Sequence, residues 1–317
     1  MKRPSKEEFD TIGLQFVSLP QSERISSIAE HFGVTTRTIY LWEDVYDSGI
    51  EEKEKDMGKD FYTMLDEYRD EQIVPVRELA ASVKKSCVIV FMSDTHLGSK
   101  FCDRKTLREH IERIAKTKRV FVIFVGDMID WGPTGPQSLL ADQAINFDTQ
   151  RDLALKMADE IGHKVLAITS GCHSHFIAGG KMIEEEFAEH TLTKNFLHDG
   201  GILNLTVGEI TYRIFMSHKL MGGSKMNPQR GLLRLNEFDL DFDIGIEAHK
   251  HCANSNQSLR RQKIITTINC GTYKFLDSYG NKKGFIGQPI TIPGIYLDAN
   301  ERIMIPNIDW ITLLRLL

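Results

Sequence analysis

The sequence lacks most of the features that mark exported, disulfide-bonded or membrane proteins. Its five cysteines are odd in number and form no C-x-x-C pair, which argues against a disulfide framework or a zinc ribbon. The most apolar run, residues 120–125 (VFVIFV), is far shorter than the ~20 residues that cross a bilayer. The first eight residues are polar, and no apolar signal segment follows them. We therefore expect a cytoplasmic protein without a membrane span.

A strong excess of one charge is also missing. The formal net charge is −5, and 41% hydrophobic with 26% charged residues is typical of an ordinary globular protein. A chain of 317 residues is long enough for one large domain and a smaller one. We predict a small helical domain over residues 1–46, a helical connector over 47–84 and a large α/β domain over 85–317.

Residues 22–46 have the layout of two helices joined by a turn at Gly33, with the second helix starting near Thr35. The positions with helical apolar spacing in the first helix are Ile25, Ile28, Ala29 and Phe32. This stretch resembles the helix-turn-helix family, with Ile39 and Trp42 as core positions of the second helix. In that family the outward face of the second helix enters the major groove of DNA. The resemblance therefore implies DNA contact by Thr36, Arg37 and Tyr40.

The charge of this region points the other way. Residues 1–60 carry 8 Lys and Arg against 13 Asp and Glu, so the basic footprint of a nucleic-acid-binding surface is missing. A small helical module that docks on protein is the alternative. Helix-turn-helix proteins often act as dimers, so a homodimer is one expectation.

The rest of the chain changes character twice. Residues 47–84 run from a charged stretch into helical patterns around 62–69 and 76–83, separated by Pro75. From residue 87 onward, short apolar strands alternate with polar helical segments, which indicates a layered α/β domain. The predicted strands are 87–92, 120–125, 165–168, 203–207, 212–216, 243–247 and 264–268.

Polar side chains able to bind metal follow five of these strands. They are Asp94, His96, Asp127, Asp130, Cys172, His173, His175, His218, His249 and His251. Mixed Asp and His ligands suit Mn²⁺, Zn²⁺, Fe²⁺ or Ni²⁺, whereas Mg²⁺ and Ca²⁺ prefer oxygen alone. An aspartate shared by two ions would hold them ~3.5–4 Å apart, as in two-metal hydrolases. The sequence therefore predicts a divalent metal site.

These motifs resemble the calcineurin-like metallophosphoesterase family, whose pattern is D-x-H, G-D-x-x-[DE], G-N-H-[DE], H and G-H-x-H, over most of residues 85–270. The resemblance implies an α/β fold in which a β-sandwich is flanked by helices in four αββα layers. It implies two divalent ions, the first bound by Asp94, His96, Asp127 and His251. The second would be bound by Asp127, residue 172, His218 and His249, with His173 as the catalytic histidine.

The third motif departs from the family pattern, because Cys172 stands where the family has Asn. A thiolate is a softer, charged ligand that favours Zn²⁺ or Fe²⁺. Cys172 is therefore a ligand of the second ion, or a neighbour of a weak second site, or the mark of an impaired enzyme. Asp130 is better interpreted as a carboxylate that orients a ligand. The Gly222–Lys225 loop is a candidate for phosphate contact, and residues 269–287 for a nucleic-acid groove.

Together these patterns predict a metal-dependent enzyme that cleaves phosphodiesters or phosphomonoesters with metal-activated hydroxide and His173 as general acid. The N-terminal resemblance favours a nucleic acid or nucleotide substrate, a combination that suits phage phosphoesterases or nucleases. The alternative is a non-catalytic DNA-binding or scaffolding protein with a degenerate phosphoesterase domain. Cys172 supports that alternative, and the retention of the other ligand types argues against it.

Overall fold

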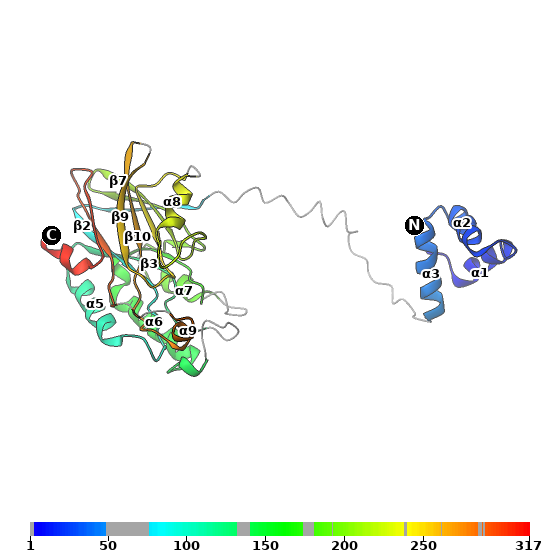
Figure 1. The fold of residues 1–317 in the computed structure, drawn as a ribbon, viewed down its shortest axis with the longest axis horizontal. Coiled ribbons are helices and arrows are strands. Elements are labelled where there is room, and N and C mark those ends of the chain that lie inside the picture. The colour runs from blue at the N-terminus through cyan, green and yellow to red at the C-terminus, as the bar shows by residue number, and fades with distance from the viewer. Residues whose placement is uncertain are drawn as a thin grey trace. The chain divides into compact units, whose positions relative to one another are not determined.

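The computed structural model describes residues 3–48, 76–131, 140–173, 181–191, 193–237, 240–260, 262–284, 287 and 289–317. The chain divides into two compact units, Met1–Gln72 and Ile73–Leu317, both drawn in Figure 1. In the described part of the chain, helices are too short or too polar to span a bilayer.

The N-terminal unit contains the helices α1 (Lys6–Gln15), α2 (Gln21–Phe32) and α3 (Thr36–Ser48). Ser5 and Glu8 form a capping box that starts α1, and Gly33 ends α2 in the left-handed conformation with φ 63°. The buried core comprises Phe9, Ile25, Ile28, Ala29, Ile39 and Trp42. The two helices predicted for residues 22–46 are present, and the predicted core positions are buried except Phe32, which is partly buried against the core.

The larger unit is built on two six-stranded sheets. The first has the order β1 (Glu78–Val83), β6 (Gly201–Val207), β7 (Ile210–Ser217), β8 (Ile244–Glu247), β10 (Lys263–Asn269) and β9 (Asn254–Arg260). The second has the order β12 (Met304–Asn307), β11 (Gly294–Leu297), β2 (Cys87–Met92), β3 (Val120–Val125), β4 (Val165–Thr169) and β5 (Phe196–Leu197). All the predicted strands are present within these sheets.

The sheets pack face to face, and helices cover their outer faces. Side chains of β2 alternate: Ile89 and Phe91 enter the core shared with the first sheet, whereas Val90 and Met92 enter the core beneath the helices. The helices on that side are α5 (Arg104–Lys116), α6 (Phe147–Ile161) and α7 (Ile183–Glu189), and α8 (Arg230–Glu237) covers the first sheet (Figure 1). The four-layer αββα arrangement is thus confirmed.

Short elements complete the larger unit. They are α9 (Ser278–Lys282) and the 3₁₀ helices Leu140–Asp142, Gly162–Lys164 and Trp310–Leu316. The apolar end of the chain packs on the second sheet, because Trp310 and Leu313 are buried in the core beneath α5 and α6.

One predicted helix is wrong. Residues 78–83 form the strand β1, which pairs in parallel with β6 from Glu78 opposite Ile202 to Val83 opposite Val207. Leu79, Ala81 and Val83 alternate toward the core between the sheets, a period of two that also fits part of a helical pattern. The backbone hydrogen bonds offered by β6 decide the conformation, and local propensity does not. The other helical pattern, residues 62–69, lies outside the described residues.

Candidate metal centre

The candidate ligands lie at the carboxyl ends of strands from both sheets. Strands β2, β3 and β4 run parallel to one another, as do β7 and β8, so within each set the carboxyl ends meet at one edge. The second sheet supplies Asp94, His96, Asp127, Cys172 and His173, and the first supplies His218, His249 and His251. Donor atoms from these residues form overlapping groups within 4.8 Å of one another. The predicted convergence of five strand ends is therefore present in the structure.

The backbone is unusual at these positions. In the described residues, positive φ angles outside glycine occur at eight positions, and five of these are candidate ligands: Asp94, His96, Asp127, His249 and His251. Such left-handed conformations are uncommon for residues with a side chain and tend to cluster at functional sites. Each costs on the order of 1–3 kcal/mol, which the surrounding packing must offset. Strain is thus concentrated where the ligands turn inward.

The first group contains Asp94, His96 and His251. Nε2 of His251 lies 3.0 Å from Oδ1 of Asp94, and Nε2 of His96 lies 3.7 Å from the same oxygen. The two imidazole nitrogens are 3.2 Å apart. One carboxylate oxygen and two ring nitrogens therefore converge on a common point.

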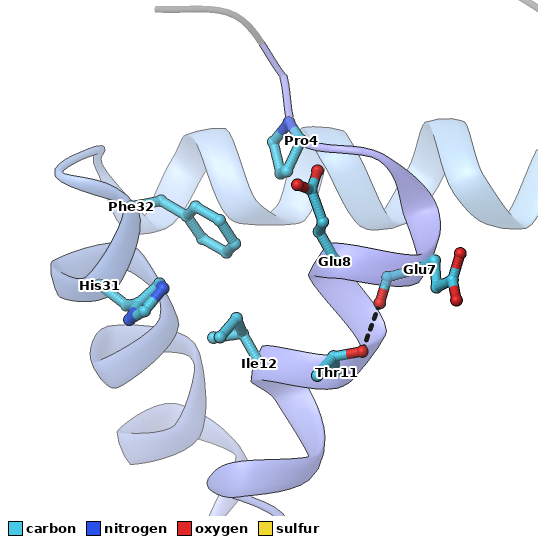
Figure 2. A pocket seen from close by; sticks show the side chains of 7 residues that line it. All are labelled: Pro4, Glu7, Glu8, Thr11, Ile12, His31 and Phe32. Atoms are coloured by element: carbon cyan, nitrogen blue, oxygen red, sulfur yellow. Dashed lines mark hydrogen bonds between the residues drawn. The ribbon is translucent and has the colours of Figure 1, made fainter.

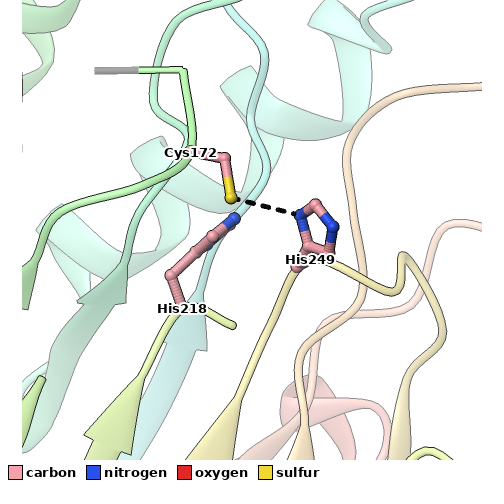
Figure 3. Close-up of side chains that lie close together, drawn as sticks. All are labelled: Cys172, His218 and His249. Carbon is pink, nitrogen blue, oxygen red and sulfur yellow. Dashed lines mark hydrogen bonds between the residues drawn. The ribbon is translucent and has the colours of Figure 1, made fainter. Parts of the chain in front are cut away.

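A second set of donors surrounds His218, which belongs to two groups, one with Asp94 and Asp127 and one with Cys172 and His249. Its Nε2 lies 3.1 Å from Oδ2 of Asp127. Figure 3 shows the side chains of Cys172, His218 and His249 pointing toward one another, with 3.6 Å between Sγ of Cys172 and Nδ1 of His249. The cysteine therefore occupies a donor position within the cluster.

The histidines are held by contacts on the side of the ring away from the cluster. Nδ1 of His218 donates to the carbonyl of Val125 over 2.8 Å, and Nδ1 of His173 donates to the carbonyl of Trp131 over 3.2 Å. A carbonyl can only accept, so the proton resides on Nδ1 and Nε2 faces the cluster. This is the tautomer that a metal ligand or a proton carrier at Nε2 requires.

His96 is held by a carboxylate that the sequence had indicated as an orienting group. Oδ1 of Asp130 lies 2.8 Å from Nδ1 of His96. The same oxygen accepts from Nζ of Lys274 over 2.9 Å, and Lys274 also lies 2.8 Å from Oδ2 of Asp277. Lys274 is 6% exposed, so this ion-pair chain is buried behind the ligand.

Lys274 and Asp277 had no role in the sequence analysis. They belong to residues 269–287, which the sequence indicated as a groove-lining segment, whereas the Lys274 side chain points into the protein. The signal available in the sequence was a lysine between Tyr273 and Phe275, and a buried lysine there requires a buried acid as partner.

Charges within the cluster compensate one another. Burial raises the pKa of Asp94, but the neighbouring His251 outweighs it and holds that pKa well below its usual range; His218 does the same for Asp127. Burial lowers the pKa of His96, yet Asp130 and Asp94 bring it to about 9. Burial and the charge of His218 lower the pKa of His249 to about 4. Carboxylate, imidazole and thiol donors gathered in a partly buried space suit a borderline divalent cation.

Glycines let the backbone segments approach closely. A Cβ on Gly171 would lie 2.8 Å from Cα of Asp127 and closer still to its N and Oδ1. The backbone N–H of His173 then donates to Oδ1 of Asp127 over 2.9 Å. Glycine before Cys172 is therefore required for the ends of β3 and β4 to sit side by side.

The remaining predicted positions are placed as follows. Thr36, Arg37 and Tyr40 are exposed on α3. His175 lies outside the described residues. Lys225 is exposed in the loop that follows His218.

The N-terminal unit has a cavity of about 480 Å³, shown in Figure 2. It is lined by Pro4, Glu7, Glu8, Thr11, Ile12, His31 and Phe32, which belong to α1, α2 and the segment before α1. Two carboxylates at a cavity disfavour an anion such as a DNA phosphate. The cavity is therefore an unfavourable place for a DNA phosphate.

No family model matches the chain, and no curated protein matches it. Similar solved structures include vacuolar protein sorting 29 from Cryptosporidium parvum, with 15% identity, a TM-score of 0.38 and coverage of 71% of this chain and 97% of that chain. A predicted phosphoesterase from Streptococcus pneumoniae has 14% identity, a TM-score of 0.34 and coverage of 71% and 99%. A metallophosphoesterase from Sphaerobacter thermophilus has 14% identity, a TM-score of 0.35 and coverage of 70% and 87%. At these values the likeness carries no conclusion about the activity of this chain.

Proposed function

We propose that the larger unit is a metal-dependent phosphoesterase of the calcineurin-like type. The observation that carries the proposal is the convergence of carboxylate, imidazole and thiol donors from five strand ends on one cluster, buried at its aspartates and partly exposed at Cys172, His249 and His251. The order of the motifs along the chain, from D-x-H to H-x-H, supports the same family. Buried donor clusters of this size, with strained backbone and oriented imidazoles, are typical of catalytic sites.

We propose that the donor atoms would divide between two ions. Asp94, His96, Asp127 and His251 would hold the first, and Asp127, Cys172, His218 and His249 the second. Divalent ions supply Lewis acidity toward phosphoryl oxygens and make water nucleophilic at neutral pH. The chain's own contribution is to fix the imidazole orientations and to keep both aspartates buried and ionised.

His173 is proposed as the residue that gives a proton to the departing oxygen. Its Nδ1 is committed to the carbonyl of Trp131, so Nε2 is the atom that carries the transferred proton. Nε2 lies 3.9 Å from Oδ2 of Asp127. Burial lowers the pKa of His173, and the charge of Asp127 offsets only part of that effect.

Hydrolysis of bis(4-nitrophenyl) phosphate tests the proposal. Chelation should abolish turnover, and His173→Ala should slow it by about 10²–10⁴-fold. His163→Ala is the matched control, because His163 is exposed on a 3₁₀ turn away from the cluster and its loss should leave turnover unchanged. Activity that survives prolonged chelation would reject the metal-dependent mechanism.

The proposed substrate is a phosphodiester of a nucleic acid or nucleotide, and the N-terminal unit is proposed to contact DNA. Two packed helices with Thr36, Arg37 and Tyr40 exposed on α3 support this interpretation. Arg37→Ala should weaken binding of duplex DNA by the full chain. Equal affinity of wild type and variant would remove α3 as the contact surface.

Cys172 supports a second candidate, a scaffolding or DNA-binding protein with an impaired phosphoesterase domain. Its thiol stands in a donor position that an amide oxygen fills in the resembled family. Metal content measured together with activity on DNA, RNA and small diesters separates the candidates. A protein that takes up metal yet cleaves none of them would favour the scaffold.

A further inference from the structure

We propose that the loop after His218 and the outer face of α8 form a binding surface for the phosphate backbone of a polynucleotide, beside the metal centre. This inference rests on the proposed phosphoesterase function and specifies its substrate class. It starts from charge: residues 219–236 contain four cations and no acid, in a chain whose net charge is −5. The four are Lys219, Lys225, Arg230 and Arg234, and all are exposed.

This basic segment is fastened to the strand end that carries His249 and His251. The backbone N–H of Leu220 donates to Oε1 of Glu247 over 3.0 Å, and Glu247 also pairs with Lys250. Lys250, which lies between the two histidines, donates to the carbonyl of Pro228 over 2.9 Å. The two ends of the loop are therefore tied to the residues that flank the candidate ligands.

Two glycines let the loop pack closely against Lys250 and Arg234. A Cβ on Gly223 would overlap Nζ of Lys250 and lie 2.7 Å from its Cε, so the loop lies directly on that lysine. A Cβ on Gly222 would meet Nη1 of Arg234 at 3.7 Å. Arg234 is thus separated from the H-x-H segment by a single turn of the loop. If one phosphate of a polynucleotide occupied the metal centre, the next phosphates of the same nucleic-acid chain would lie toward this basic surface.

The outer face of α8 is hollowed. A cavity of about 380 Å³ is lined by Asn227, Arg230, Leu233, Arg234 and Glu237. Its single acid, Glu237, lies 4.0 Å from the guanidinium of Arg260, which counters the negative charge. Guanidinium groups present planar, paired donors that match phosphate oxygens. The arrangement fits a chain of phosphates better than it fits a neutral or cationic ligand.

The exposed methionines of the same loop agree with a polymeric ligand. Met221 is 85% exposed and Met226 is 95% exposed, so this segment offers flexible apolar side chains next to its cations. Such side chains adapt to many apolar surfaces, including the faces of unpaired bases. A free phosphate would leave them without a contact.

The test measures how well a short single-stranded oligodeoxynucleotide inhibits hydrolysis of bis(4-nitrophenyl) phosphate by the full chain. We compare wild type, Arg230→Gln/Arg234→Gln, and the charge-matched control Arg108→Gln/Lys116→Gln. The control positions are exposed on α5, in the helical layer over the other sheet. Removing one cation that binds a phosphate of a single strand should lower the slope of log affinity against log salt by about 0.7.

We expect the α8 variant to bind the oligonucleotide at least tenfold more weakly, with a slope reduced by about 1.4, while the small diester turns over as in wild type. The α5 control should match wild type in both measurements. Equal inhibition constants in all three proteins would overturn the inference, as would a phosphoserine peptide that competes as well as the oligonucleotide.

The proposed phosphoesterase function fails in a different way. If neither wild type nor any variant hydrolyses the small diester, the phosphoesterase assignment is rejected. Fluorescence anisotropy of the labelled oligonucleotide with the same three proteins then decides the surface on its own: weaker binding confined to the α8 variant supports it, and equal affinities reject it.

Discussion

Replacing Lys274 with Met should destabilise the larger unit by leaving Asp130 buried with one partner fewer. Lys274→Met shortens the side chain by one atom and removes its charge and its hydrogen-bond donors, and it leaves no large cavity. Asp130 is 0% exposed, and its Oδ1 lies 2.9 Å from Nζ of Lys274. Breaking a buried pair by removing one partner costs about 3–5 kcal/mol.

The structure places this variant at the lower end of that range. His96 stays 2.8 Å from Asp130 and retains part of the compensating charge. Asp277, the other partner of Lys274, has a side chain that is 15% exposed and can regain water. We therefore expect a loss of about 3 kcal/mol, a large share of the ~5–15 kcal/mol typical of a folded domain.

The assay is urea unfolding of the metal-free protein, followed by circular dichroism, for wild type, Lys274→Met, Asp130→Asn and the double variant. Because the two side chains share one buried interaction, the double variant should be less destabilised than the sum of the single variants, by about 2 kcal/mol. Additive effects, or a loss below about 1 kcal/mol for Lys274→Met, would refute the buried-pair reasoning.

Three further predictions concern the cluster itself. Gly171→Ala should displace Asp127, because N and Oδ1 of Asp127 occupy the space of the new methyl group. A shift of ~1 Å should lower turnover by about 10²-fold and leave the circular dichroism spectrum unchanged. Normal turnover would contradict the close approach. With Co²⁺ in place of the native ions, wild type should show a sulfur-to-metal charge-transfer band that Cys172→Ser lacks, and a band that persists would exclude Cys172 as the ligand. The pKa of His96 is raised to about 9, so below this pH a metal ion must displace a proton from His96. The affinity for the metal ion, measured by calorimetry, should therefore rise about tenfold per pH unit from pH ~7 to 9. In the metal-free protein the same shift stabilises the fold fully below pH 6.5, and this stabilisation disappears as the pH rises through about 9; a flat profile in both measurements would disagree with the Asp130 contact.

The strand ends could be predicted from the sequence because each apolar run stops directly at a polar motif. Strand β3 is an unbroken apolar stretch, and Gly126 and Asp127 follow it directly. The local sequence alone therefore predicts both the strand and the residue at which it ends. Parallel pairing then brings such ends together without further information.

Other features depend on partners far along the chain. Strand β1 is fixed by pairing with β6, more than a hundred residues later, and its own residues fit part of a helical pattern equally well. Lys274 is buried against Asp130, a partner 144 residues earlier in the chain. The left-handed backbone at Asp94 and His96 likewise has no local signal, since neither residue type requires it.

The most direct measurement of the central proposal is an anomalous difference map from a crystal soaked in zinc. We predict peaks bounded by Asp94, His96, Asp127 and His251 and by Asp127, Cys172, His218 and His249. A map without a peak at these side chains, or with zinc bound only elsewhere on the chain, would contradict the metal centre and the hydrolytic function built on it.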